Sequence, residues 1–264
     1  MVSVHPSMLE TGPEAPRRLP DLTPFYRLVA LETCGSTNDE ARELARNGAP
    51  EGTLVWTRRQ DYGRGRRGRT WSSPEGNLFM TVVLRPAVAP AAAAQVSFVA
   101  AVALAEAIGS LIPGVPRLKW PNDVLIDGAK TAGILLESEP GRAGTVDWLV
   151  LGIGVNVCHF PPDTEYRATS VAASGAPQVT VETMLERLAD RLEVWYRRWS
   201  TQGFAPVRAA WLAAAHGLGG PVMVRLGDGA FTARFADLDA DGALVAELES
   251  GATRRVTAGD VFFG

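Results

Sequence analysis

The sequence predicts an α+β protein of two parts, a larger mixed domain followed by a small all-β domain. Up to about residue 217, short β-rich runs alternate with two long helical patterns. After the glycine-rich stretch 217–220 the sequence pattern changes to short runs of alternating apolar and polar residues, separated by Gly-Asp, Asp-Gly and Ser-Gly turns. Roughly 45 residues of this pattern are typical of a small β-barrel.

The first helix is predicted from its end signals. Thr37 followed by Glu40 fits a capping box, in which the two side chains would bond the first free backbone N–H groups. Gly48 suits the left-handed position that commonly follows a helix. We therefore expect a helix from about residue 38 to residue 46.

Two β-rich runs flank the most unusual stretch of the chain. "TLVWT" (53–57) and "LFMTVVL" (78–84) are bounded by glycine or proline, which indicates strands. The stretch "QDYGRGRRGRTW" (60–71) lies between them and is predicted to be a loop.

Two longer segments are predicted to be helical. Residues 91–112 form an alanine-rich apolar run after Pro90; proline suits a first helical turn, and polar residues within the run favour a buried helix over a membrane span. Residues 181–200 carry apolar side chains at three- and four-residue steps, with Thr180 as N-cap. These side chains are Leu185, Leu188, Leu192, Trp195 and Trp199.

The remaining runs indicate strands. Asp127-Gly128 between two apolar runs predicts a hairpin, and "TVDWLVLGIGVNV" (145–157) predicts another buried strand. The C-terminal runs predicted as strands are "PVMVRL", "AFTARFADL", "ALVAEL" and "RRVTAGDVFF".

Composition limits the function classes. Hydrophobic content of 46% and charged content of 21% are those of a soluble globular protein, and a net charge of −3 argues against a general nucleic-acid binder. Two cysteines far apart indicate a reducing compartment and no structural zinc. Residues 1–24 hold five prolines and no apolar core of a secretory signal, so we expect a disordered or loosely attached extension on a cytoplasmic protein.

The arginine-glycine loop matches G-x-G-x-x-G over residues 63–68. A dinucleotide fingerprint needs a helix directly after the loop, whereas "RTWSSPEGN" has turn chemistry. Glycine lets the backbone approach a ligand and arginine binds carboxylate or phosphate in a forked geometry. The loop therefore suits an anionic small molecule, with a solvated basic loop as the alternative.

Other polar residues are ambiguous when taken singly. "KWPND" (119–123) and Lys130 could serve a triphosphate with Mg²⁺, or could form a turn with a surface ion pair. Gly133 inside an apolar strand indicates a bulge, a close ligand approach or a packing need. Asn156 lies within an apolar run, where a buried structural amide would need hydrogen-bond partners.

As a set, the motifs "GSTN", "QDYGRGRRGRTW", "KWPNDV", "KTAGILLE" and "GIGVNV" resemble the biotin protein ligases in order and spacing. The resemblance runs from about Phe25 to the C-terminus. It implies a catalytic domain related to class II aminoacyl-tRNA synthetases over residues 25–217 and an SH3-like domain over residues 218–264. It also implies an ATP-dependent enzyme that forms biotinyl-5′-AMP and transfers biotin to a lysine of a biotin carboxyl carrier domain.

The resemblance assigns roles to thirteen residues. The biotin-binding set is Ser36, Thr37, Gln60, Arg64, Arg66, Lys130 and Gly133; the ATP-binding set is Arg66, Arg69, Trp71, Lys119, Asn122, Lys130 and Asn156. The catalytic set is Arg66, Lys130 and Asp123, with no residue assigned to a metal.

The chemistry of the implied reaction is compatible with these roles. A carboxylate must approach an α-phosphate, and at ~4 Å and an effective dielectric of ~20 their repulsion is about 4 kcal/mol, which Arg66 and Lys130 would offset. Mg²⁺ would neutralise the pyrophosphate, and Asp123 would position the incoming lysine amine. A loop that is mobile when empty and closes over biotin would shield the reactive anhydride from water.

Two features depart from the family pattern. Some members repress biotin genes through an N-terminal DNA-binding domain, and about 24 residues are too few for one, so we expect no DNA partner. Asp61-Tyr62 stands where many relatives have a small residue before the first loop glycine. The oligomeric state is left open, a homodimer included. The alternative functions are a lipoate or octanoate ligase of the same fold and a nucleic-acid-binding module that uses the arginine loop.

Overall fold

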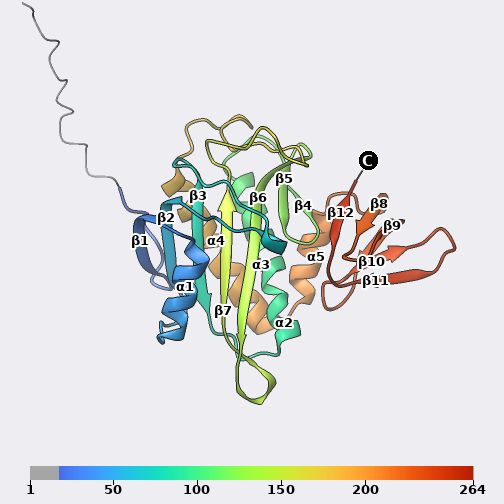
Figure 1. The fold of residues 1–264 in the computed structure, drawn as a ribbon, viewed down its shortest axis with the longest axis horizontal. Helices are drawn as coiled ribbons and strands as arrows, with labels where there is room; N and C mark the ends of the chain where they lie inside the picture. Colours follow the sequence, from blue (N-terminus) through green and yellow to red (C-terminus); the bar gives the residue numbers. More distant parts are fainter. Residues whose placement is uncertain (1–17, 264) are drawn as a thin grey trace, which may run out of the picture.

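The computed structural model describes residues 18–263. Its main part is a seven-stranded sheet with the order β1-β2-β3-β7-β6-β5-β4 (Figure 1). β1 and β2 are parallel and all other neighbours are antiparallel. The strands are β1 (Arg27–Cys34), β2 (Thr53–Gln60), β3 (Leu78–Leu84), β4 (Arg117–Lys119), β5 (Asp123–Ile126), β6 (Ala129–Pro140) and β7 (Val146–Val155).

Helices cover the two faces of this sheet unequally. α3 (Val96–Gly109) lies against α4 (Val181–Gln202) and α5 (Ala205–Ala213), and these three helices form the large core with one face of the sheet. α1 (Thr37–Arg46) covers only part of the opposite face, where a small second cluster forms. The rest of that face is left for the segment between β2 and β3 (Figure 1).

Side chains alternate between the two faces along β7, and their sizes show why α1 covers only part of the second face. Trp148 and Val150 point to the small cluster beneath α1. The next two residues on the same face are Gly152 and Gly154, and the space above them is taken by Asn38 and Trp71. The strand thus changes from large side chains to glycines where it passes from the helix to the open part of the face.

Several predictions from sequence are confirmed. Asp127 and Gly128 both have positive φ, 48° and 74°, and join β5 to β6 as the expected hairpin. Thr180 caps α4 by accepting a hydrogen bond from the Thr183 N–H at 3.2 Å. Gly48, at φ 83°, follows α1 in the left-handed region.

Other predictions are wrong in detail. The capping box does not form, because Ser36 is the N-cap and the Thr37 side chain instead bonds to Gln60 at 3.1 Å. The single helix expected over residues 91–112 is two helices, α2 (Pro90–Ala94) and α3, which meet at Gln95. By length and composition Pro90–Gly109 could span a membrane, but 61% of the relevant window is buried in the fold, as expected for a core helix.

The C-terminal part is a five-stranded antiparallel sheet with the order β11-β10-β9-β8-β12. The last predicted strand is two strands separated by a turn. The strands are β8 (Pro221–Arg225), β9 (Ala230–Leu238), β10 (Leu244–Glu247), β11 (Thr253–Val256) and β12 (Asp260–Phe262). Figure 1 shows this sheet beside α5, where Phe235 packs on Trp211 with ring centroids 6.3 Å apart. The Trp120 indole N–H donates to the Gly242 carbonyl at 3.1 Å, so the two parts are joined close to the "KWPND" turn.

The segment before β1 is attached to α4. Arg18 and the Asp21 N–H both bond to Glu186, at 2.7 and 2.8 Å. Most of the extension expected over residues 1–24 lies outside the described residues. The domain limits at residues 24 and 217 stay predictions.

Candidate active site

All thirteen residues singled out from the sequence line one cavity of about 270 Å³. It lies on the open part of the sheet face, beneath the segment 61–71, which we call the lid. In Figure 1 the lid runs from the end of β2 across β7 and β6 toward β5 and β12. The lining residues are Ser36, Thr37, Gln60, Arg64, Arg66, Arg69, Trp71, Lys119, Asn122, Asp123, Lys130, Gly133 and Asn156. Their roles stay predictions, but their assembly from five separate motifs is a property of the fold.

One end of the cavity is polar and held firmly in place. The Gln60 Oε1 atom accepts hydrogen bonds from the Thr37 backbone N–H at 2.8 Å and the Thr37 hydroxyl at 3.1 Å. The Gln60 amide nitrogen donates to the Ser73 hydroxyl at 2.9 Å. Ser36 beside them is buried. These contacts fix the amide orientation, so this end presents hydrogen-bonding groups of set direction to a small polar ring.

The floor of the cavity is made of glycine. Gly133 on β6 and Gly154 on β7 are directly paired across the two strands. A Cβ at Gly133 would lie 3.0 Å from the Trp71 ring, and one at Gly154 would lie 2.6 Å from it. The lid residue Trp71 can therefore lie directly against the sheet only because both positions lack a side chain. This close approach accounts for Gly133, whereas no local pattern in the sequence indicated that Gly154 shares the role.

The other end of the cavity gathers cations. Lys130 Nζ lies 2.6 Å from Asp123 Oδ1 across the β5–β6 hairpin. Arg66 donates to Asn122 Oδ1 at 2.9 Å. Lys119 Nζ lies 4.2 Å from the centroid of the Tyr166 ring. Positive charge thus converges from β4, β6 and the lid, which suits a polyanionic ligand.

Two of these cations are buried in a way that disfavours their charged form when the cavity holds no anion. Desolvation lowers the pKa of Arg66, and the neighbouring Asp260 carboxylate offsets only part of the effect. Desolvation also lowers the pKa of Lys119, against a smaller opposing effect of Asp123. A bound phosphate or carboxylate would remove this unfavourable burial, so the site is electrostatically prepared for an anion.

The two asparagines hold their positions through main-chain contacts. Asn122 donates to the Ile134 carbonyl at 2.8 Å, and Asn156, which is buried, donates to the Thr169 carbonyl at 3.0 Å. Their side chains are therefore orientated before any ligand arrives. Asn156 meets the expectation that a buried amide is satisfied, and it still lines the cavity.

Ion pairs tie the lid to the rest of the protein at both ends, in contrast to the loop that was expected to be mobile when empty. Near its start, Arg64 pairs with Asp39 and Glu137, each at 2.9 Å. Near its end, Arg67 and Arg69 both donate to Asp260 Oδ2, at 3.1 and 2.6 Å. Three of the four lid arginines are thus held in ion pairs with carboxylates, and Arg66 donates to Asn122.

The turn in the lid is sharp. Arg67 has φ 55° and is followed by Gly68 at φ 72°, so two successive residues lie in the left-handed region. This conformation is unfavourable for arginine, and its ion pair with Asp260 helps to hold it. Burial acts to lower the pKa of Arg69, but the hydrogen bond and charge of Asp260 outweigh it and raise that pKa.

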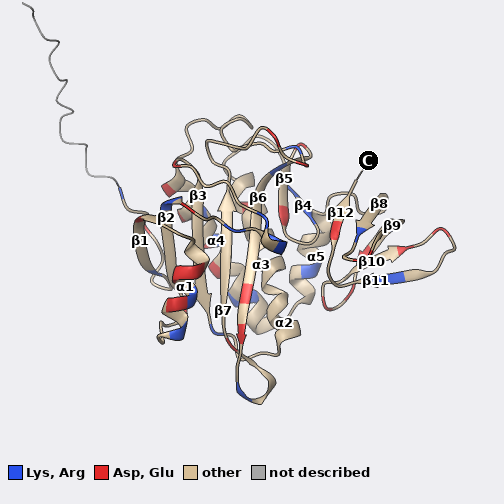
Figure 2. Cartoon of the chain, viewed as in Figure 1, with Lys and Arg blue, Asp and Glu red and all other residues tan. Residues whose placement is uncertain are grey.

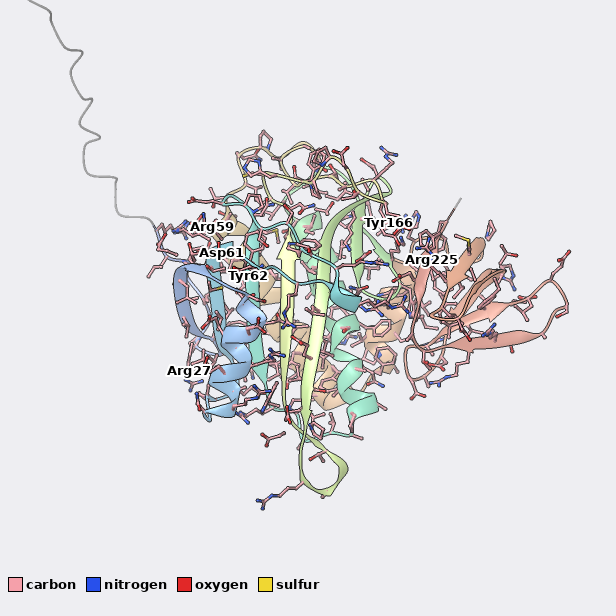
Figure 3. The ribbon with its side chains drawn as sticks, viewed as in Figure 1. Arg27, Arg59, Asp61, Tyr62, Tyr166 and Arg225 are labelled. Atoms are coloured by element: carbon pink, nitrogen blue, oxygen red, sulfur yellow. The ribbon has the colours of Figure 1, made fainter. Side chains whose placement is uncertain are left out.

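Some residues of the site have no local sequence signal. Asp260 comes from β12 in the C-terminal sheet, and Tyr166 and Glu165 come from the irregular segment after β7. Tyr166 stacks on Phe262 with centroids 5.3 Å apart, and Arg225 pairs with Glu165 at 2.8 Å. Figure 3 shows Tyr166 and Arg225 close together where the catalytic part meets the C-terminal sheet. Proximity between such distant segments can be seen only in the folded chain.

A dedicated metal site is not evident in residues 18–263, which hold no group of three or more His, Cys, Asp and Glu side chains able to bind an ion. Both carboxylates nearest the cations, Asp123 and Asp260, are already in ion pairs.

Comparison with known proteins agrees with this geometry. The Biotin/lipoate A/B protein ligase family matches residues 68–213, and the Biotin protein ligase C terminal domain matches residues 217–264. A biotin–[acetyl-CoA-carboxylase] ligase of Paracoccus denitrificans is 44% identical over 89% of this chain and 99% of its own length. A ligase of the same name from Mycobacterium tuberculosis is 33% identical over 90% of this chain and 89% of its own.

Solved structures show the same fold with ligands bound. The biotin protein ligase of Aquifex aeolicus in complex with biotin and ATP superimposes with a TM-score of 0.75 at 26% identity, over 90% of this chain and 98% of that one. Its mutant in complex with biotin gives a TM-score of 0.76 over the same shares. The predicted fold class is confirmed, and the chain belongs to the biotin protein ligase family.

Proposed function

We propose that this ligase forms biotinyl-5′-AMP from biotin and ATP in the cavity beneath the lid, and then passes biotin to a lysine of a biotin carboxyl carrier domain. One observation carries the assignment of residues: the thirteen motif residues line a single cavity, polar at one end and cationic at the other. A neutral polar ring and a triphosphate need those two environments side by side. The named relatives favour biotin over the lipoate alternative.

Biotin would bind with its ring at the polar end. Gln60 and Thr37 are already bonded to each other, and Ser36 is buried beside them. Because these groups are fixed beforehand, little conformational entropy is lost when the ring binds. The acid chain would then run past Trp71, which rests on Gly133 and Gly154, toward the cations.

In the first step a biotin carboxylate oxygen attacks the α-phosphorus of ATP. The bond from that phosphorus to the bridging oxygen breaks, and pyrophosphate leaves with the electron pair. Arg66 and Lys130 would flank the two approaching anions, whose repulsion at ~4 Å is about 4 kcal/mol at an effective dielectric of ~20. Mg²⁺ carried by the triphosphate would neutralise the leaving group.

In the second step the carrier amine attacks the acyl carbon and AMP departs. The amine must first lose a proton, since a free lysine has a pKa of about 10.4. Asp123 was expected to position this amine, and it lies at the cavity, but its carboxylate is in contact with Lys130. We therefore propose a double task for Asp123: it orients Lys130 in the first step and receives the amine after Lys130 has turned to the phosphate.

The test of the function is ATP–pyrophosphate exchange with purified protein. Exchange should require biotin and should not occur with lipoate or octanoate. Arg66→Ala should lower the rate about 10²–10³-fold, the range for removal of a group that stabilises transition-state charge. Exchange that proceeds without biotin, or DNA binding that weakens with salt and ignores biotin, would refute the proposal.

Asp123→Asn separates the two halves of the reaction. If Asp123 serves both steps, the variant should slow exchange and should also slow transfer from preformed biotinyl-5′-AMP to a carrier domain. An unchanged transfer rate would remove Asp123 from the second step and leave it as the partner of Lys130.

A further inference from the structure

The guanidinium of Arg64 is fully engaged by protein carboxylates. Its Nη2 atom lies 2.9 Å from Asp39 Oδ1 and 2.9 Å from Glu137 Oε2, and its Nη1 atom lies 3.3 Å from Glu137 Oε1. Arg42 completes the group, at 2.6 Å from Asp39 and 3.4 Å from Glu137. Two guanidinium groups and two carboxylates carry no net charge together. Arg64 therefore offers no spare positive charge to a substrate carboxylate.

Arg66, two residues further along the lid, differs in this respect. Its side chain donates to the neutral Asn122 amide and makes no direct ion pair with any residue between 18 and 263. It is also deep enough for desolvation to lower its pKa. Of these two lid arginines, only Arg66 brings into the cavity a charge that no carboxylate contacts directly in the described part of the chain. The expectation that both residues bind biotin does not fit this difference.

The acidic partners of Arg64 are themselves held in place. Asn38 donates to Glu137 Oε2 at 2.8 Å and accepts from the Thr81 hydroxyl at 2.8 Å. Gly152 leaves room for this amide, since a Cβ there would lie 1.9 Å from Asn38 Oδ1. Thr81 also lies 2.9 Å from the Thr37 hydroxyl, which bonds to Gln60. The buried network therefore links the carboxylate that holds the lid to the polar end of the cavity.

We propose that Arg64 is a positioning residue that fastens the lid to α1 and β6, and that it does not bind the substrate anion. Asp39, Glu137 and Arg64 together are called the lid latch. Figure 2 shows the acidic segments of α1 and β6 on the face that the basic lid crosses. Backbone hydrogen bonds from Trp71 to Gly63 and from Gly65 to Arg69 hold the lid's own fold, and the charge-assisted contacts of Arg64 fasten this unit to α1 and β6.

The chain offers a matched control for removing the latch. Glu139 lies two residues after Glu137 on the same face of β6 and also pairs with an arginine of α1, Arg46, at 3.9 Å. Glu139→Gln therefore makes the same chemical change, on the same strand, without touching the lid. The test variants are Arg64→Gln, Glu137→Gln and the double variant Asp39→Asn/Glu137→Gln.

The first measurement is amide hydrogen exchange of the ligand-free protein, read from peptides that cover residues 61–71. The double variant and Arg64→Gln should raise lid exchange about tenfold, and Glu137→Gln should raise it less because Asp39 remains. Peptides of β3 and β7 should stay protected, and Glu139→Gln should match the wild type. This measurement needs no substrate, so it is independent of the proposed function.

The second measurement rests on the proposed function and distinguishes a latch from a ligand. A latch predicts that Arg64→Gln and the double variant lose bound biotinyl-5′-AMP at the same increased rate, and that combining all three changes adds nothing. A direct role predicts that Arg64→Gln alone weakens biotin binding. Unchanged lid exchange in Arg64→Gln and the double variant, or an affinity loss confined to Arg64→Gln, would overturn the proposal.

Discussion

The glycine floor gives the most specific prediction, because two glycines of the same cross-strand pair differ in how closely Trp71 approaches them. A Cβ at Gly154 would lie 2.6 Å from two atoms of the Trp71 ring, and a Cβ at Gly133 would lie 3.0 Å from one. Carbon atoms attract best at about 3.5–4.0 Å, so Gly154→Ala must push the ring away by roughly 1 Å and Gly133→Ala by about half as much. The ring carries the lid with it, and the lid carries Arg66.

The expected loss is in activity more than in stability. Displacing a positioning group by ~1 Å can cost about 100-fold in rate, so Gly154→Ala should lower kcat/KM for biotin in pyrophosphate exchange by that order, and Gly133→Ala by roughly tenfold. Overpacking a closed core costs about 1–3 kcal/mol, but Trp71 is only partly buried and the lid can shift with it, so urea unfolding should place both variants at or below the lower limit. The smaller ring of Trp71→Phe should restore part of the activity of Gly154→Ala. Equal kcat/KM values for Gly154→Ala and the wild type would refute the claim that Trp71 must rest on this floor.

Two further predictions concern buried polar groups. Thr81→Val removes the hydroxyl bonded to Thr37 and Asn38 and leaves the buried Asn38 Oδ1 without this donor. The free energy of unfolding in urea should therefore fall by about 1–3 kcal/mol. A loss below roughly 0.5 kcal/mol, the size expected for a surface substitution, would contradict the buried network. Burial lowers the pKa of Lys119, so the unfolded chain holds this proton more tightly than the folded one. The free energy of unfolding should therefore rise as the pH increases through the folded-state pKa of Lys119 toward the unfolded value near 10.4. Urea unfolding at pH 7 and pH 9.5 should show a larger increase in this free energy for the wild type than for Lys119→Met. Parallel pH profiles of the two proteins would count against the assignment.

Local chemistry explains which parts of the fold were predictable. Asp127-Gly128 and Thr180 were identified because a hairpin turn and a helix cap depend on neighbouring residues alone. The Thr37 capping box failed for a tertiary reason: Gln60, 23 positions along the chain, takes the hydroxyl of Thr37. Gln95 separates α2 from α3 within an otherwise uniform apolar run, and no local signal marked that break.

The candidate site shows a similar division. The motif residues could be named because several short patterns together resemble one family, and the fold brings all of them to one cavity. Asp260, Glu137 and Gly154 could not be named, because each acts through contact with a lid residue that lies between 73 and 191 positions away in the sequence. A carboxylate that holds an arginine looks like any surface acid in the sequence. Only the geometry shows that Arg64 is engaged and Arg66 is not.

The central claim is that one cavity both forms the adenylate and shields it until a carrier lysine arrives. A single-turnover experiment tests this directly: the protein is mixed with biotin, α-labelled MgATP and pyrophosphatase, and then separated from free nucleotide by rapid gel filtration. We expect one labelled biotinyl-5′-AMP to be retained per active site, and its label to be released as AMP when a carrier domain is added. Adenylate found only in the small-molecule fractions, or none formed although both substrates bind, would contradict it.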